Sequence, residues 1–239
     1  MLQNIKKRKT AKTSFLAFAP QNFNDKTLSP LVNSNNEVRT LEKYYNGTSF
    51  INEKATKETF LKNLGQASII HLATHADAQD SITPWIAFYN EKLLLEELYF
   101  TKNNANLVFL SGCNTTIGKQ EVGEGIISLA RGFFYSGSQS VISSLWSIGD
   151  RSTSEIVESF YENLDNGQTK SMALHNAKLS YINNHTGSYI SPHYWASFIL
   201  LGEDDTVQNS SFNWWILFSV CVLISFTIYL RRFFVKSRS

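Results

Sequence analysis

Short apolar runs alternate with helical segments along most of this 239-residue chain, and this alternation restricts its possible folds. The runs are rich in Val, Ile, Leu and Phe, as in strands buried on both faces. Strands that alternate with helices form βαβ units, so we expect an α/β fold with a mainly parallel sheet covered on both sides. The expected strands are 14–19, 49–52, 67–73, 85–89, 106–111, 140–145 and 195–201; the expected helices are 35–47, 53–65, 93–100, 122–135, 153–165 and 170–183.

The charge of the chain is segregated although its net value is only +2. Residues 1–13 and 231–239 are basic, and the long part between them is acidic. Binding to nucleic acid requires a basic face that neutralises phosphates, so we do not expect a nucleic-acid partner.

A membrane helix is expected near the end of the chain, over residues 213–230, after a linker at 204–212. Trp214 to Leu230 contains no charged residue and is near the minimum length for crossing a bilayer. Aromatic residues flank it, as at membrane interfaces. The alternative is a buried core helix.

The orientation of this single-pass segment follows from its flanking charges. The basic tail at 231–239 favours a cytoplasmic C-terminus, and a tail anchor with the reverse orientation is the alternative. The basic, polar segment 1–13 lacks an apolar signal sequence. Either the domain stays inside the cell, or an upstream part of a longer protein precedes it.

Two histidines lie near the end of the expected strand 67–73. The loop after the strand begins near His75, which places it at the carboxyl edge of the sheet, where α/β folds carry their sites. His71 lies deeper and is interpreted as a satisfied core residue. A metal site is not expected, because the helical zinc motif requires Glu where Leu72 stands and no third ligand follows.

Cys113 follows the expected strand 106–111, and the chain has only one other cysteine, Cys221. With Cys221 inside the expected membrane segment, no disulfide is predicted. A thiol becomes a nucleophile when a nearby imidazole or converging N–H groups favour the thiolate. A lone buried cysteine is more often a small apolar residue, so on spacing alone both interpretations stay open.

Five ordered segments resemble the CHAT domain, a caspase-like family related to separase and often found beside tetratricopeptide repeats. They read HLATHA, LVFLSGCNT, VGEGIISLARGFFYSG, SQSVISSLWSIGD and SPHYWASFILLGE, and the resemblance extends over residues 14–203. It implies a caspase-like three-layer α/β sandwich and the chemistry of a cysteine peptidase.

The resemblance also implies roles for individual residues. His75 corresponds to the catalytic histidine of the family and Cys113 to its nucleophile. The backbone N–H groups of Ala76 and Cys113 would form the oxyanion hole. The family usually has Gly at position 76, and alanine disfavours a positive φ angle.

Two further residues, Asp150 and His193, match family positions, and Glu124 lies at the start of an expected helix. Asp150 corresponds to an acidic residue that lines the substrate pocket in separase-like relatives, where it would favour Lys or Arg; the alternative is an N-cap for a helix from Arg151. Glu124 and His193 are interpreted as structural.

The sequence therefore predicts a membrane-anchored cysteine endopeptidase that cleaves protein or peptide substrates with a Cys/His dyad and no cofactor. Its expected partners are a protein substrate, the lipid bilayer, and tetratricopeptide repeats upstream or on another chain. The alternative is a weak or inactive CHAT module that acts as a membrane-tethered scaffold.

Overall fold

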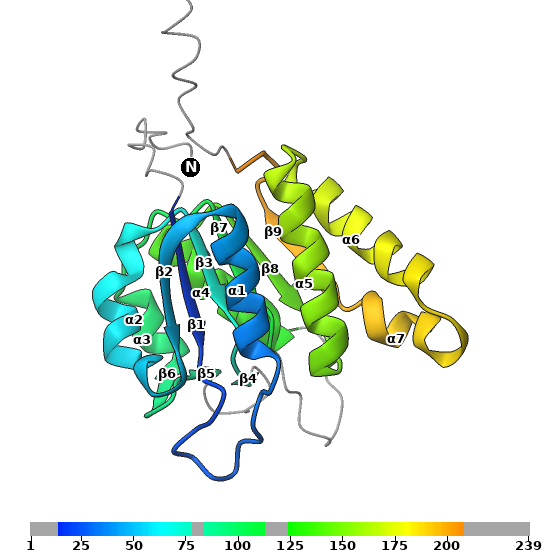
Figure 1. Ribbon diagram of the computed structural model, residues 1–239. Helices are drawn as coiled ribbons and strands as arrows, with labels where there is room; N and C mark the ends of the chain where they lie inside the picture. The colour runs from blue at the N-terminus through cyan, green and yellow to red at the C-terminus, as the bar shows by residue number, and fades with distance from the viewer. Residues whose placement is uncertain (1–13, 78–83, 113–123, 208–239) are drawn as a thin grey trace, which may run out of the picture. The chain divides into compact units, whose positions relative to one another are not determined.

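The centre of the protein is a six-stranded sheet with the order β2-β1-β3-β7-β8-β9 (Figure 1). The computed structural model describes residues 14–77, 84–112 and 124–207. All neighbouring strands in this sheet are parallel except β9, which runs antiparallel to β8. This confirms the prediction of a mainly parallel sheet. The strands are β1 (Ser14–Ala19), β2 (Asn46–Ile51), β3 (Ile69–Leu72), β7 (Leu107–Leu110), β8 (Ser140–Ser144) and β9 (Phe198–Gly202).

Helices cover both faces of the sheet and complete a three-layer sandwich (Figure 1). The first face is covered by α1 (Ser34–Tyr44), α5 (Asp150–Asp165) and α6 (Lys170–Asn184); the second by α2 (Lys57–Asn63), α3 (Leu95–Tyr99) and α4 (Glu124–Ser136). Short helical turns join these elements: η1 (Asn52–Lys54), η2 (Leu64–Gln66), η3 (Gly187–Ile190) and α7 (Pro192–Trp195).

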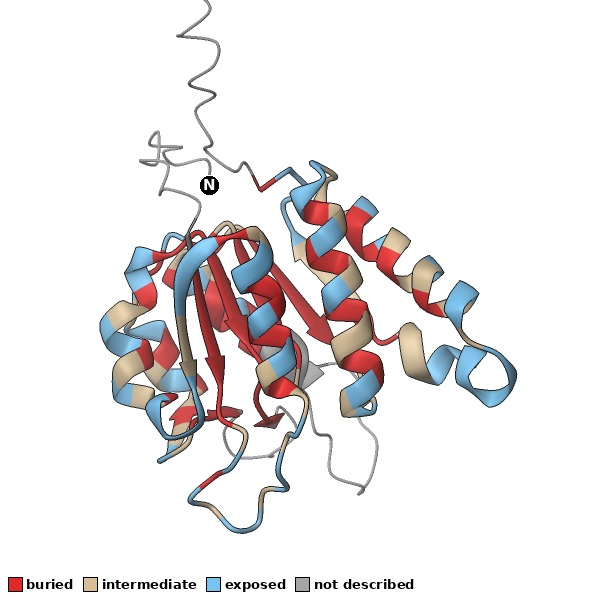
Figure 2. Ribbon diagram, viewed as in Figure 1, coloured by how far each residue is buried: buried red, intermediate tan, exposed pale blue. Residues whose placement is uncertain are grey.

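The alternation of side chains along each strand divides the core between the two faces. Phe15 and Ala17 of β1 pack toward α1 and α5, whereas Leu16 and Phe18 pack toward α2. The inner strands β1, β3, β7 and β8 are buried, whereas the edge strand β2 and the outer sides of the helices are largely exposed (Figure 2). Each fully buried large apolar side chain contributes about 1.5–3 kcal/mol, so the sheet is the most stabilised part of the domain.

A second, antiparallel sheet lies beside the first, and only its middle strand was predicted, within 85–89. It has the order β4-β5-β6 and consists of β4 (Ala76–Asp77), β5 (Trp85–Ala87) and β6 (Lys92–Leu94). The single helix expected at 93–100 is therefore wrong at its start, because Leu93 pairs with Ile86 and is buried.

The last strand begins later than predicted. Trp195 was expected to open it, but this residue ends α7, and β9 begins at Phe198. Pro192 is the first residue of that helix, where its missing N–H costs nothing and its fixed φ suits the helix.

The chain after β9 continues to contact the domain over residues expected to be a linker. Asp204 caps α6 by accepting a hydrogen bond from the backbone N–H of Ser171 at 2.8 Å, and Asp205 pairs with the buried Lys170. In the described ranges, no helix has the length and apolar character needed to cross a membrane. The segment predicted to do so, 213–230, lies outside the described residues, as do 1–13 and 231–239.

Candidate active site

The carboxyl ends of β3 and β7 lie side by side in the sheet. Leu72 of β3 is in register with Leu110 of β7, and the backbone N–H of Ser111 donates to the carbonyl of Leu72 at 3.1 Å. His75 and Cys113 therefore each follow a paired residue by three positions. Cys113 lies outside the described residues, so the structure gives the end of the strand before it and the surroundings of His75.

Gly112 allows these two strand ends to come together. A Cβ atom at this position would collide with the carbonyl oxygen of Thr74, the residue before His75. Any larger residue would therefore have to push the two loops apart. Gly112 thus permits a close approach of the two backbones.

The His75 side chain is 2% exposed, and its ring is fixed by the loop between β1 and α1. Its Nε2 atom donates a hydrogen bond to the backbone carbonyl of Ser29 at 2.7 Å. Nε2 therefore carries the proton of the neutral ring, which leaves a lone pair on Nδ1. Nδ1 is buried and has no hydrogen-bond partner among the described residues. This arrangement is suited to accepting a proton at Nδ1.

Burial lowers the pKa of His75 below its ordinary value of 6.5, because an apolar environment disfavours the charged ring. The hydrogen bond to Ser29 and the negative charge of Asp150 act in the opposite direction and offset part of this effect. His75 is thus mainly neutral at neutral pH, the form that a general base requires.

A small apolar cluster supports the loop that carries Ser29. Phe23, Trp85 and Ala87 form it, with the partly buried Leu28 and Leu31 packed against them. The ring of Phe23 also contacts His75, with 5.0 Å between the ring centroids. The antiparallel sheet is therefore the base on which the His75-binding loop rests.

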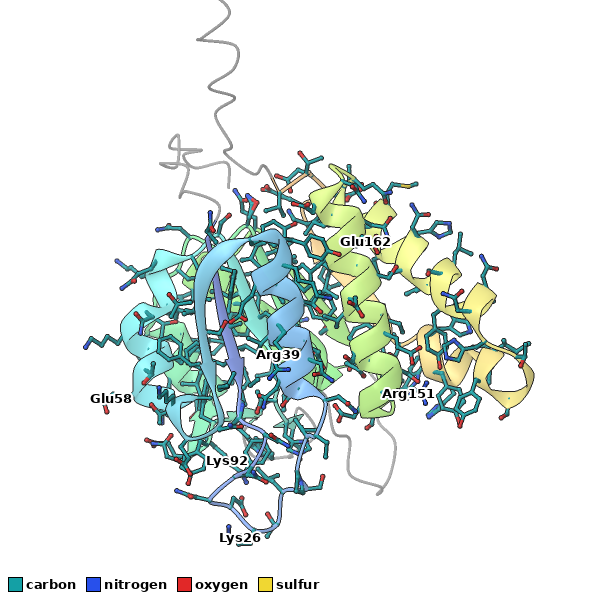
Figure 3. The ribbon with its side chains drawn as sticks, in the orientation of Figure 1. Lys26, Arg39, Glu58, Lys92, Arg151 and Glu162 are labelled. Atoms are coloured by element: carbon teal, nitrogen blue, oxygen red, sulfur yellow. The ribbon has the colours of Figure 1, made fainter. Side chains whose placement is uncertain are left out.

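His75 opens onto a cavity of about 210 Å³ at the carboxyl edge of the sheet. Its walls come from the β1–α1 loop, the first turns of α1 and α5, and the ends of β3 and β7, with Leu31 and Ile148 as apolar lining. Arg151, at the start of α5, and Lys26, in the β1–α1 loop, both lie toward this end of the domain (Figure 3). Most ligand pockets measure about 300–1,000 Å³, so this cavity has the size for a single side chain.

Asp150 lines this cavity, as the sequence interpretation of a substrate-pocket residue requires. Its Oδ2 accepts hydrogen bonds from the backbone N–H of Asn33 at 2.7 Å and from Nδ2 of Asn33 at 3.0 Å. The alternative role as the N-cap of α5 is wrong, because Gly149 is the N-cap and Asp150 is the first helical residue. Asp150 instead satisfies the start of α1, 117 positions away.

Ala76 opens β4 directly after His75. It pairs with Ile86 in extended conformation, and Asn52 is the single non-glycine residue with positive φ among those described. Alanine is therefore compatible with the backbone at this position. Whether its N–H binds an oxyanion stays a prediction.

His71 is a satisfied core residue, as expected. Its ring lies between Tyr161, whose hydroxyl is 3.1 Å from Nδ1, and Glu37, whose Oε2 is 3.1 Å from Nε2. Glu37 also lines the cavity, and the sequence analysis missed it. The available signal was its place in the stripe Ser34, Glu37, Val38 and Leu41, the buried face of α1.

The remaining matched positions lie apart from this cavity or outside the described side chains. The backbone carbonyl of His193 accepts a hydrogen bond from the indole N–H of Trp146 at 2.9 Å, a structural contact. Glu124 is the first residue of α4. Within the described ranges, no group of three His, Cys, Asp or Glu side chains is arranged to hold a metal ion.

Comparisons of the sequence identify similar proteins. The family model of the CHAT domain matches residues 2–203. Tetratricopeptide repeat protein 28 from mouse and from human are 23% and 24% identical over 76% of this chain. The chain spans 9% of the length of these curated relatives.

Solved structures with a similar fold are cysteine peptidases of the caspase type. Separase from Saccharomyces cerevisiae, in complex with securin, superposes with a TM-score of 0.53 at 16% identity over 81% of this chain and 12% of separase. The Arg-specific cysteine proteinase gingipain R superposes with a TM-score of 0.54 at 14% identity, over 81% of this chain and 46% of the gingipain chain. The Drosophila initiator caspase Dronc gives 0.50 at 8% identity, over 85% of both chains.

Proposed function

This chain belongs to the CHAT domain family, and we propose that it is a cysteine endopeptidase with Cys113 as nucleophile and His75 as general base. The observation that carries this proposal is the state of the His75 ring. Its Nε2 is bonded to the Ser29 carbonyl, and its buried Nδ1 has no partner in the described part of the chain. A ring held in this way supplies a base at one defined atom.

The proposed reaction uses that atom in both of its stages, acylation and hydrolysis. Nδ1 of His75 accepts the thiol proton of Cys113 as Sγ attacks the scissile carbonyl carbon. The backbone N–H groups of Ala76 and Cys113 stabilise the resulting oxyanion. Nδ1–H then protonates the leaving amine, and the C–N bond breaks to leave a thioester. A water molecule, deprotonated by Nδ1, attacks the thioester and releases the acid and the free thiol.

The proposed substrate is a protein with a basic residue before the scissile bond. Asp150 supports this, because it lines the cavity and its Oδ2 is held there by the backbone N–H and Nδ2 of Asn33. A carboxylate oxygen that faces a cavity is a strong acceptor for a guanidinium or ammonium group. Gingipain R, with a similar fold, is Arg-specific by name.

We further propose that the domain is tethered to a lipid bilayer through residues 213–230, with the basic tail on the cytoplasmic side. The support is the uncharged apolar sequence with aromatic ends and the Arg231–Arg232 pair that follows. Tetratricopeptide repeats, on the same or another chain, are the proposed regulatory partner. Carbonate extraction of membranes compares the intact chain with one that lacks 213–239; release of both forms alike would rule out the tether.

The test of the enzyme is cleavage of a peptide library with varied residues before the scissile bond. Cys113→Ala and His75→Gln should each abolish cleavage, and Cys221→Ala, the matched control, should leave it unchanged. Cleavage by Cys113→Ala at the wild-type rate would refute the assignment. Circular dichroism of each variant separates loss of chemistry from loss of fold.

A scaffold function is the second candidate, favoured by Ala76 at a position where the family usually has glycine. Thiol alkylation distinguishes the two functions. Selective labelling of Cys113 near neutral pH that slows in His75→Gln supports the enzyme. Labelling at the slow rate of an ordinary thiol, in both proteins, supports the scaffold.

A further inference from the structure

Glu37 places a second carboxylate in the cavity that contains Asp150. It lies in the first turn of α1, lines the cavity, and is only 2% exposed. Its Oε2 lies 3.1 Å from Nε2 of His71, with which it shares a hydrogen bond. Burying a carboxylate is costly unless it is paired and hydrogen-bonded, so its presence at a cavity calls for an explanation.

The His71 ring joins Glu37 to Tyr161 across the core. Burial raises the pKa of Tyr161 well above its ordinary value, so its hydroxyl keeps its proton. This hydroxyl lies 3.1 Å from Nδ1 of His71, and Nε2 of the same ring lies 3.1 Å from Oε2 of Glu37. The chain of hydrogen bonds therefore holds the Glu37 carboxyl group in place beside the cavity that it lines.

Asp150 and Glu37 both reach the cavity at the start of α1. Asp150 is bonded to Asn33 at the start of that helix, and Glu37 follows Asn33 by four positions. Residues four apart lie on the same face of a helix, with about 5–6 Å between their Cβ atoms. Asp150 is half-buried and Glu37 is nearly inaccessible, so the first lies nearer the mouth and the second deeper.

We propose that Glu37 makes this cavity select arginine over lysine, an inference that rests on the proposed peptidase function and its basic-residue pocket. A guanidinium has five N–H donors in a planar fork and can reach two carboxylates from opposite edges. An ammonium is a compact point charge on a flexible stem and cannot span both groups with the same geometry. Leu31 and Ile148 provide the apolar wall for the methylene groups of either side chain.

The experiment measures binding rather than turnover. Acetylated tetrapeptides that differ only in a C-terminal Arg, Lys or citrulline are titrated into the Cys113→Ala chain by calorimetry. We expect the Arg peptide to bind at least about tenfold more tightly than the Lys peptide. Adding Glu37→Gln, which keeps the shape but not the charge, should reduce this ratio to less than about threefold. Tyr161→Phe, the matched control, removes the far end of the hydrogen-bond chain but not the carboxylate, and should keep the ratio.

The outcomes separate this inference from the proposed function. Equal binding of Arg and Lys peptides to Cys113→Ala, or an unchanged ratio in Glu37→Gln, overturns the role of Glu37 but leaves the basic pocket in place. Binding of neither peptide, or equal binding of the citrulline peptide, overturns the basic pocket together with this inference. If Glu37→Gln does not fold, Glu37→Asp, which withdraws the carboxylate by one methylene, provides the same comparison, and an unchanged ratio there counts against the proposal.

Discussion

The backbone carbonyl oxygen of Ser29 lies 2.7 Å from Nε2 of His75, a contact between residues 46 positions apart. In the proposed mechanism, this contact makes the state of the His75 ring depend on the conformation of the β1–α1 loop. No substitution of the Ser29 side chain removes this contact, because the acceptor is a backbone atom. The dependence of His75 on this loop can therefore be tested through the side chains that hold the loop in place.

Phe23→Ala should weaken this loop and slow the reaction. Phe23 is 4% exposed and packs on both the small apolar cluster and the His75 ring. Truncation of a buried Phe costs about 3–5 kcal/mol when the core cannot relax, and less in a loop cluster of this size. We expect a loss of about 2–3 kcal/mol in urea unfolding, with Cys113 alkylation slowed in the variant that is still folded. Val32→Ala, in the same loop but 65% exposed, should change neither the free energy of unfolding nor the alkylation rate. Equal effects of Phe23→Ala and Val32→Ala would show that the apolar cluster does not control His75.

The lowered pKa of His75 predicts how stability depends on pH. The pKa of this ring is about 6.5 in the unfolded chain and lower in the folded protein, because burial disfavours its charge. Between these two pKa values the unfolded chain binds more protons than the folded protein. The contribution of His75 to stability is therefore complete above pH 6.5 and decreases as the pH falls below this value.

His75→Gln provides the comparison for this pH effect, because its amide nitrogen can still donate to Ser29. The wild-type Tm should fall more steeply than that of the variant as the pH decreases below 6.5. Parallel Tm curves for the two proteins would contradict a lowered pKa for His75.

Gly112→Ala should destabilise the domain and impair the site. The added methyl group would collide with the carbonyl oxygen of Thr74, so the ends of β3 and β7 must separate. We expect a cost of about 1–3 kcal/mol, as for other overpacked positions, together with slower thiol alkylation. Gly65→Ala is the matched control, since its methyl group would meet only the Lys102 carbonyl at 3.6 Å. Equal stability of the two variants would show that the strand ends can move apart freely.

The sequence predicted the parts of the site that are carried by strands. His75 was located correctly after β3 because a buried strand is recognisable as an apolar run, and its polar end then marks the sheet edge. Ser29 could not be found in this way, because a backbone carbonyl has no side-chain signature and its partner is distant in sequence. In the antiparallel sheet, β5 was expected within 85–89, but β4 and β6 were missed because strands of two or three residues are too short to show a period.

Helix α1 shows the same limit for a buried charge. Its apolar spacing predicted a helix near 35–47, and the structure has it at Ser34–Tyr44. The pattern could not show that Glu37 faces inward to His71, because a single carboxylate on an amphipathic helix is usually solvated. Its place on the apolar stripe of α1 was the available signal, and the contact with His71 of β3 identifies its partner.

The bonds between Asp150 and Asn33 predict that substrate recognition and stability share one residue. Asp150→Ala removes the acceptor of two hydrogen bonds, one of them from the backbone N–H of Asn33. Because Asp150 is half-buried, we expect a cost of about 1–2 kcal/mol, below the upper range for charged hydrogen bonds. Asn33→Ala removes only the side-chain bond and should cost about half as much.

A double-mutant cycle in urea unfolding measures the coupling of this pair. The combined variant should lose less than the sum of the single losses, by about 0.5–1 kcal/mol, because both changes remove the same side-chain bond. Strict additivity would show that Asp150 does not hold the start of α1 in solution. In that case its carboxylate would be free to turn into the cavity, and Asn33→Ala would leave the affinity for peptides ending in Arg unchanged. If the two residues are coupled, Asn33→Ala should alter the affinity for peptides ending in Arg. Asn33 holds Oδ2 of Asp150, and this contact fixes the direction in which Oδ1 points.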